Sequence, residues 1–206
     1  MKKLFTFIRQ QDMDGVKSII DKSPELINSI SKGTPKKDDG QSPLQVALKS
    51  SSTQIINYLL DKGANVNFIE GEDCSNAWRA PVIHDAINRA IMRARWNVNG
   101  EVFGTKQSSD EAFAILKRIV ELGADVNAKD SYNNACLDRA CLQAKQVLPM
   151  SNSKDKVLTK ELKADMKRIF ALLIQNGADL NYVKPNGTGK TYLEEYGNDT
   201  IGLFLK

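Results

Sequence analysis

The sequence predicts an all-α protein made of stacked helical repeats, and three observations lead to this prediction. A pentapeptide of the form Gly-Ala-Asp/Asn-Val/Leu-Asn occurs three times, at residues 63–67, 123–127 and 177–181. Apolar residues at helical spacing directly precede each copy. A turn and a helix start, at residues 39–47, lie upstream of the first copy. An element that recurs in this way indicates supersecondary units that stack on one another.

Each pentapeptide begins with a glycine that can end a helix. Helices are expected at residues 56–62, 118–122 and 169–176, which are the C-terminal halves of amphipathic segments. Glycine after such a segment accepts the left-handed conformation that terminates a helix, a conformation that costs other residues about 1 kcal/mol or more. Each copy therefore marks the end of a helix.

The helix start at residues 39–47 reads Asp-Gly-Gln-Ser-Pro-Leu-Gln-Val-Ala. Asp-Gly suits a tight turn, and Ser-Pro supplies a helix cap and a first helical residue. Weaker forms, each of which keeps an apolar residue at the leucine position, occur at residues 81–86, 135–140 and 191–196. Together with the pentapeptide, this start resembles the ankyrin-repeat family, whose signature is Thr-Pro-Leu-His-x-Ala in a 33-residue unit of a turn and two helices.

The pentapeptides are 60 and 54 residues apart, so two units are longer than the family's unit. The apolar start residue and the final glycine are 19 residues apart in the unit ending at residue 63, but 40 apart in the next two units. Apolar residues keep helical spacing through residues 83–98 and 137–148. Residues 97–100 and 149–153 interrupt this spacing. Residues 108–111 can form the capping box of a returning helix. We therefore predict long helical insertions in repeats 3 and 4, packed side by side.

The resemblance covers almost the whole chain as one ankyrin-repeat solenoid domain of five units, in which the first and last act as caps. Residues 1–28 lack the turn motif but show two short helical segments. The last unit has a capping box from Thr191 to Glu194 but is too short for two full helices. The approximate units are residues 1–37, 38–70, 71–129, 130–183 and 184–206.

The composition and charge of the chain give little indication of catalysis or of metal binding. The 206-residue chain has a net charge of +4, three cysteines without CxxC spacing and one histidine, which is no standard zinc set. We expect no enzyme activity, no cofactor and no metal. Residues 4–8 are too short an apolar run for a signal peptide, and no later run reaches membrane-spanning length. The expectation is a cytoplasmic monomer with reduced thiols.

Three further features have structural interpretations that compete with functional ones. His84 occupies the histidine position of the ankyrin start, where the resemblance implies hydrogen bonds to a neighbouring hairpin. Residues 186–191, Asn-Gly-Thr-Gly-Lys-Thr, resemble a phosphate loop but lack its first glycine and coincide with the hairpin of the last repeat. Cys136 and Cys141 suit packing near a helix start better than redox or metal chemistry.

The resemblance implies binding of a protein partner through the concave face of hairpin tips and inner helices. Trp78, Arg89 and Tyr132 are the expected anchors, and Leu142 would add to the contact surface if it is exposed. The positions that ankyrin-repeat proteins vary to suit their partners correspond here to Asp39, Gln41, Lys49, Ser50, Trp78, Arg79, Asn88, Arg89, Ser131, Tyr132, Asn134 and Gln143.

Two basic segments leave alternatives open. One set with helical spacing, which can form a second, outward binding face, is Arg89, Met92, Arg93 and Trp96. In the competing interpretation, Trp96 packs within the extended hairpin and the arginines are solvated. The alternative function is binding of nucleic acid or another polyanion through Arg89, Arg93, Arg95 and the basic residues of repeat 4. Those residues, which equally suit a solvated helix face, are Lys145, Lys154, Lys156, Lys160, Lys163, Lys167 and Arg168.

Overall fold

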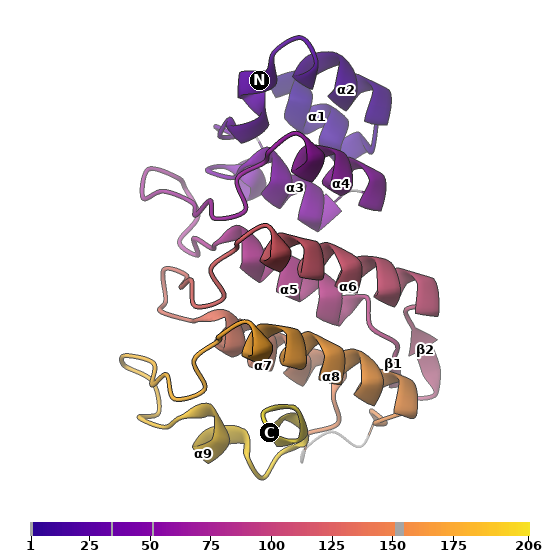
Figure 1. Cartoon of the computed structure of the whole chain (residues 1–206), viewed down its shortest axis with the longest axis vertical. Helices are drawn as coiled ribbons and strands as arrows, with labels where there is room; N and C mark the ends of the chain where they lie inside the picture. Colours follow the sequence, from indigo (N-terminus) through magenta and orange to yellow (C-terminus); the bar gives the residue numbers. More distant parts are fainter. Residues whose placement is uncertain (1, 34, 51, 151–154) are drawn as a thin grey trace.

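The helices form a column of pairs stacked in chain order (Figure 1). The computed structural model describes residues 2–33, 35–50, 52–150 and 155–206. The first helices of the pairs form one row, made of α1 (Lys2–Gln10), α3 (Pro43–Ser50), α5 (Val82–Met92) and α7 (Cys136–Val147). The second helices form the other row, made of α2 (Met13–Ile20), α4 (Thr53–Asp61), α6 (Lys106–Glu121) and α8 (Lys160–Gln175).

Shorter elements complete the column. The C-terminal end is covered by the short helix α9 (Tyr192–Tyr196) and the 3-10 helix η3 (Thr200–Phe204). Two further 3-10 helices, η1 (Pro24–Asn28) and η2 (Lys36–Asp38), lie between α2 and α3. The chain also contains one two-stranded antiparallel sheet, β1 (Trp96–Val98) paired with β2 (Glu101–Phe103), between α5 and α6.

The helix ends follow from local sequence. Gly63, Gly123 and Gly177 come just after α4, α6 and α8 and have φ angles of 84°, 89° and 92°, the left-handed region that favours glycine. At the last helix, the side chain of Thr191 accepts a hydrogen bond from the backbone N–H of Glu194, and the Glu194 carboxylate accepts one from the N–H of Thr191. The capping box predicted there is confirmed.

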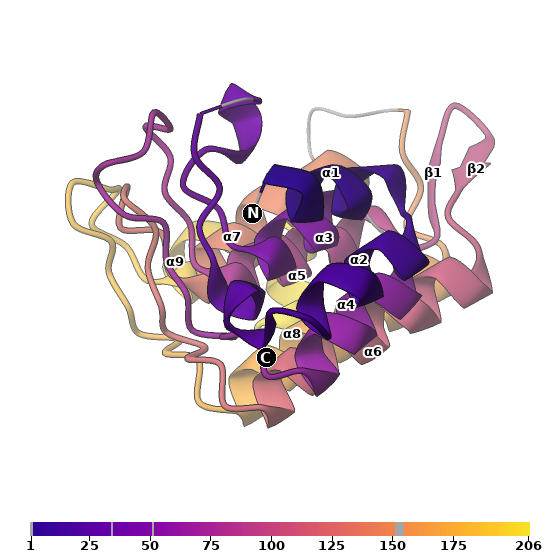
Figure 2. The ribbon, with the colours of Figure 1, turned by 90° about the horizontal axis from the view of Figure 1, so that it is seen from above.

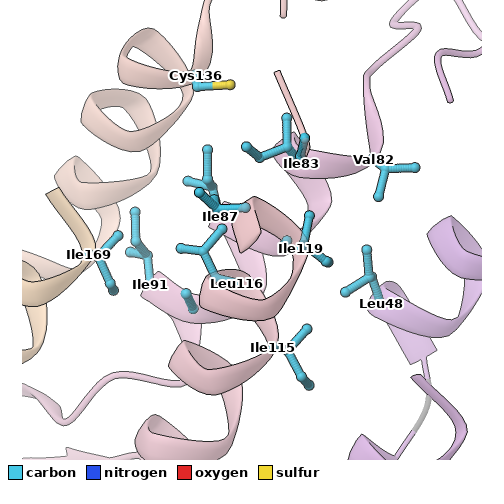
Figure 3. Packing of buried hydrophobic residues seen from close by; sticks show 14 of the residues in the cluster. Leu48, Val82, Ile83, Ile87, Ile91, Ile115, Leu116, Ile119, Cys136 and Ile169 are labelled. Carbon is cyan, nitrogen blue, oxygen red and sulfur yellow. The ribbon is translucent and has the colours of Figure 1, made fainter. Parts of the chain in front are cut away.

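The core lies between the two rows and runs through successive pairs (Figure 3). In α5, Ile83, Ile87 and Ile91 are at most 1% exposed, and they pack with Leu116 and Ile119 of α6. These α5 residues are the ones whose helical spacing predicted a buried stripe. Burying a side chain of this size contributes about 1.5 to 3 kcal/mol.

The asparagine that ends one pentapeptide forms hydrogen bonds with the backbone of the next pentapeptide along the chain. The Oδ1 atom of Asn67 accepts a hydrogen bond from the backbone N–H of Asp125 at 2.8 Å. Its Nδ2 group donates to the carbonyl oxygen of Gly123 at 2.9 Å. We call this pair of bonds between consecutive pentapeptides the asparagine clamp.

The asparagine clamp recurs along the column. Asn127 accepts from the N–H of Asp179 and donates to the carbonyl of Gly177, both at 2.9 Å. Asn28, at the end of the first unit, makes the same two contacts with residues 65 and 63, at 2.8 and 3.5 Å. The clamp has the same form at Asn67 and Asn127, although the pentapeptides that it joins are 60 and 54 residues apart.

The extra residues of the two long units are partly helical. Compared with α3, α5 is three residues longer and α7 four residues longer, while α6 and α8 each exceed α4 by seven residues. Helix α6 begins at Lys106 with a capping box between Thr105 and Ser108, so the prediction that placed this box at residues 108–111 is three residues too late.

The insertion of the third unit is not helical throughout. Residues 97–100, predicted only as a break in the helix, belong to a β-hairpin in which the rings of Trp96 and Phe103 stack with centroids 4.3 Å apart. Val98 also forms a β-bridge with Lys156 of the fourth unit. The second predicted break extends into residues 151–153, which lie outside the described residues. The segment between α5 and α6 and the segment between α7 and α8 are therefore in direct contact, and part of this contact is β-structure.

Asp165 of α8 fastens the third unit's insertion to the fourth unit. Its carboxylate accepts hydrogen bonds from Nε and Nη2 of Arg95 at 2.9 and 2.8 Å, and from the Arg95 backbone N–H at 3.1 Å. Arg168 lies 3.0 Å from the same carboxylate. Burial opposes ionisation of Asp165, but these donors outweigh it and keep the pKa of Asp165 below its usual value.

Asp165→Ala should lower the free energy of unfolding by about 3 kcal/mol, because it leaves Arg95 without its carboxylate in a partly buried site. The measurement is equilibrium denaturation at neutral pH. Glu161→Ala, an exposed position on the same helix, is the matched control and should change stability by less than about 0.5 kcal/mol. Equal losses in both variants would contradict the fastening role of Asp165.

Candidate functional site

The first row of helices and the loops between successive pairs form one face of the column, which we call the inner face. Seen along the column (Figure 2), these loops project together beyond one end of the helices, and the β1–β2 hairpin projects at the opposite end. The helices α3, α5 and α7 thus lie between projecting segments on both sides. This face brings residues from different repeats together.

A hollow of about 280 Å³ opens between α3 and α5 on the inner face, and we call it the N-terminal hollow. It is lined by Leu48, Lys49, Trp78, Asp85, Asn88, Arg89, Met92 and Arg93. The predicted contact residues among them, gathered from one loop and two helices, are Lys49, Trp78, Asn88, Arg89 and Arg93.

Trp78 is held firmly in the wall of this hollow. Its Nε1 group donates to Oδ2 of Asp130 at 2.7 Å. The guanidinium carbon of Arg139 lies 4.6 Å from the centroid of the indole ring, and Nζ of Lys49 lies 5.9 Å from it. Cations at such distances from an aromatic face are attracted to it. Because the ring is already fixed, a partner that contacts it immobilises no further side chain.

Two buried carboxyl groups lie close to Lys49, a residue of the N-terminal hollow: Asp85, which lines the hollow, and Glu70, which does not. Nζ of Lys49 is 3.8 Å from Oε1 of Glu70 and 3.4 Å from Oδ2 of Asp85, and Gln45 donates to Glu70 at 3.3 Å. Burial raises the pKa of Glu70 to about 7 and that of Asp85 to about 6, although the Lys49 ammonium opposes both shifts. The ammonium group of Lys49 is therefore shared by two carboxyl groups.

The rim of the hollow is cationic and partly apolar. Arg89 donates from Nη1 to the carbonyl oxygen of Leu48 at 3.1 Å, and Arg93 is exposed. Among the described residues, neither arginine forms an ion pair within 4.0 Å. Met92 lies beside them and is 42% exposed. Arginine and an exposed apolar side chain at the edge of a hollow are typical of protein-binding surfaces.

Two predicted contact residues, Gln41 and Asn134, are buried. Gln41 is 3% exposed and donates to the carbonyl of Lys37. Asn134 is 6% exposed and its Nδ2 donates to both carboxylate oxygens of Asp130. The family offsets identify positions in the repeat, but burial at those positions depends on the loops of this chain.

Three others hold neighbouring loops together. Asp39 accepts hydrogen bonds from the backbone N–H of Gly33 and from Ser75, and these bonds lower its pKa to about 2. Arg79 and Ser131 join adjacent loops through two bonds, from Ser131 N–H to the Arg79 carbonyl at 3.0 Å and from Arg79 N–H to Ser131 Oγ at 3.1 Å. Their polar groups serve the stack itself.

The remaining candidates differ in exposure. Tyr132 is 53% exposed and Leu142 is 38% exposed, as a contact surface requires. Gln143 is half-buried, and Ser50 donates to the carbonyl of Val46 at 2.7 Å. Trp96 stacks on Phe103 within the β-hairpin, so the structure favours the packing interpretation for it over the outward face.

The basic residues of the third and fourth units do not form one patch. Arg95 and Arg168 are engaged by Asp165 and Asp110. Arg89 and Arg93 lie at the N-terminal hollow, whereas the exposed lysines of α8 belong to the other row. Lys154 lies outside the described residues. The other basic residues of this set, all described, are Lys145, Lys156, Lys160, Lys163 and Lys167.

His84 has the structural role expected for it. It is fully buried, and its Nε2 atom lies 3.2 Å from the carbonyl oxygen of Ala128 in the next loop. Burial lowers its pKa to about 4, so the imidazole is neutral at pH 7. Cys136 and Cys141 are also buried, and burial raises the pKa of both thiols.

Comparison with known families identifies the repeat. Residues 39–70, which contain α3 and α4 and reach Glu70, match the family model described as Ankyrin repeat. The chain therefore contains an ankyrin repeat. No curated protein matches it. None of the helices in the described part has both the length and the apolar character needed to span a bilayer. The same residues contain no group of three or more His, Cys, Asp or Glu side chains placed to hold a metal ion.

The sequence analysis did not identify the buried pair of carboxyl groups, Glu70 and Asp85. Glu70 lies in the loop beyond the pentapeptide, where no helical period indicates burial. Asp85 sits beside His84 in the helix start, and its only signal is a charged residue between apolar neighbours. A charged residue between apolar neighbours predicts a buried carboxyl group only when its cationic partner is known. The partner of Asp85 is Lys49, which lies on a different helix and cannot be identified from local sequence.

Glu70→Gln should stabilise the protein at pH 8 and have little effect near pH 5. The unfolded carboxyl ionises near 4.5 and the folded one near 7, so the unfolded state binds fewer protons between these values and stability falls as pH rises. Denaturation at both pH values should show a gain of up to about 3 kcal/mol at pH 8 only. Glu72→Gln, exposed in the same loop, is the control, and a pH-independent effect of Glu70→Gln would contradict the account.

Proposed function

We propose that this protein is a non-enzymatic scaffold that binds a protein partner through its inner face, the concave face of the solenoid. Ankyrin repeats generally mediate protein–protein interactions, and the family is typically non-enzymatic. The proposal treats the column as a five-unit ankyrin-repeat solenoid with capping first and last units and with insertions in the third and fourth. Its units are about residues 1–37, 38–70, 71–129, 130–183 and 184–206.

The convergence of predicted contact positions on the N-terminal hollow is the observation that carries this proposal. Lys49, Trp78, Asn88, Arg89 and Arg93 come from separate elements, yet they line one hollow with a fixed aromatic wall and a cationic rim. Central, desolvated aromatic and arginine residues supply most of the binding energy in protein interfaces. Tyr132 and Leu142 extend the exposed contact surface toward the C-terminal end.

Binding of nucleic acid has less support than binding of protein. Arg95 forms an ion pair with Asp165, and Arg168 forms one with Asp110. These two cations are therefore not available to a polyanion. The exposed lysines of α8 lie on the opposite row from Arg89 and Arg93. A polyanion would have to reach both rows to contact all of them.

Selection from a displayed random-peptide library tests the function without a known partner. We expect the wild-type protein to enrich a family of related peptides, and Met92→Ala/Arg93→Ala to weaken their binding by about tenfold or more. Trp78 is a poor first variant because its bond to Asp130 also supports a loop.

The matched control is Lys117→Ala/Leu122→Ala, which removes one cation and one exposed apolar residue around the end of α6 in the other row. Its affinity for the enriched peptides should equal that of the wild type. Equal weakening in both double variants, or unchanged binding in Met92→Ala/Arg93→Ala, would exclude the N-terminal hollow as the binding site.

A further inference from the structure

A second hollow, of about 190 Å³, lies between α7, the loop of residues 182–190 and α9, and we call it the C-terminal hollow. The loop resembling a phosphate loop, residues 186–191, supplies part of its lining. Three lysines from three different segments also line it, namely Lys145, Lys184 and Lys190.

The acidic groups of the C-terminal hollow are satisfied from within the chain. Asp138 accepts hydrogen bonds from the hydroxyl of Tyr192 and from the N–H of Ala135, both at 2.8 Å. Glu195 accepts one from the hydroxyl of Thr188 at 2.8 Å. Among the described residues, neither carboxyl group forms an ion pair with a lysine of the hollow, whose lining holds three lysines and two acidic residues.

The three lysines have spare donors. Nζ of Lys184 donates to Oδ1 of Asn134 at 2.7 Å, and Nζ of Lys145 lies 4.7 Å from the ring centroid of Tyr196. Within the described residues, none of the three has a carboxylate within 4.0 Å. Three ammonium groups without ion pairs around one small hollow favour a carboxylate or another compact anion as its occupant.

The two hollows lie along the same row of helices. Leu142 of α7 lines the C-terminal hollow, and Asn88 of α5 lines the N-terminal hollow. These residues occupy equivalent positions, five residues after the apolar start residues Leu137 and Ile83. The centre of the N-terminal hollow lies between α3 and α5, and that of the C-terminal hollow lies between α7 and α9, which is two helix spacings further along the row. Neighbouring helices pack about 8 to 10 Å apart, so the two centres are roughly 16 to 20 Å apart. An extended chain covers this distance in about five or six residues.

We infer that the inner face recognises an extended acidic peptide segment, with one acidic side chain at each hollow and about five or six residues between them. This inference rests on the proposed function and specifies its ligand. Arg89 and Arg93 receive the first acidic side chain, and the three lysines receive the second.

The surface between the hollows favours a peptide over a nucleic acid. Leu142, which lines the C-terminal hollow, its neighbour Gln143 on α7 and Tyr132 in the loop before α7 present apolar or neutral groups. Arg139 of α7 stacks on Trp78 and pairs with Asp130 at 3.3 Å. A peptide can place neutral side chains over such a surface, whereas a nucleic acid carries a phosphate at every nucleotide and gains affinity from continuous basic contacts.

Fluorescence anisotropy with labelled synthetic peptides tests the inference. The probes carry two Glu-Glu pairs about two, six or ten residues apart in a Ser-Gly-Ala background. We expect the six-residue spacing to bind tightest and its Gln-Gln counterpart at least tenfold more weakly. The variant Lys145→Gln/Lys184→Gln/Lys190→Gln should no longer bind the Glu-Glu probe more tightly than the Gln-Gln probe, and its affinity should no longer depend on the spacing. Lys160→Gln/Lys163→Gln/Lys167→Gln, which removes the same charge from α8, should bind like the wild type.

Several outcomes would overturn the inference. These are affinity that does not depend on spacing, equal losses in the two lysine variants, no measurable binding of any acidic probe, or tighter binding of a labelled oligo-dT than of the peptides. If the peptide library yields neutral sequences whose binding needs Met92 and Arg93, the proposed function stands and only the acidic specificity fails. If Met92→Ala/Arg93→Ala leaves all selected peptides bound, the proposed function itself fails.

Discussion

The asparagine clamp sets the register on which the rest of the structure depends. Each clamp bonds one side chain to two backbone groups of the next pentapeptide, at the point where the preceding helix has just ended. Because Asn67 and Asn127 make these bonds with nearly equal lengths, consecutive helix pairs are joined alike whatever lies within them. The loops and inner helices of successive units then align, and residues from different repeats share one face.

This register explains how helices of unequal length fit into one column. Helices α6 and α8 are each seven residues longer than α4. The added residues lie at the ends of these helices that are away from the clamps. The extended parts fasten to each other through the Arg95–Asp165 pair and the bridge from Val98 to Lys156. The insertions form a lateral contact of their own, opposite the projecting loops (Figure 2). The inner face between them keeps its geometry.

Local signals in the sequence were enough to predict much of the fold, because glycine stops and apolar stripes act within a few residues. The β-hairpin was missed, since three-residue strands are too short to show an alternating period. For the candidate site, fixed offsets within the repeat selected Lys49 and Arg89, and helical spacing selected Arg93; all three line one hollow. Gln41, which the offsets also selected, is buried and donates to the carbonyl of Lys37. The carboxyl groups beneath Lys49 and the ion pair at Asp165 depend on contacts between helices, which no local pattern reveals.

Comparing two asparagines at equivalent positions tests the clamp most directly. Asn127 joins its unit to the next, whereas the side chain of Asn181, at the same place in the last pentapeptide, makes no hydrogen bond to another unit within the described residues. Equilibrium denaturation should show that Asn127→Ala lowers the free energy of unfolding by about 1 to 2 kcal/mol, while Asn181→Ala changes it by less than about 0.5 kcal/mol. Equal losses in the two variants would mean that the asparagine acts within its own turn, and the clamp would not be what keeps the repeats in register.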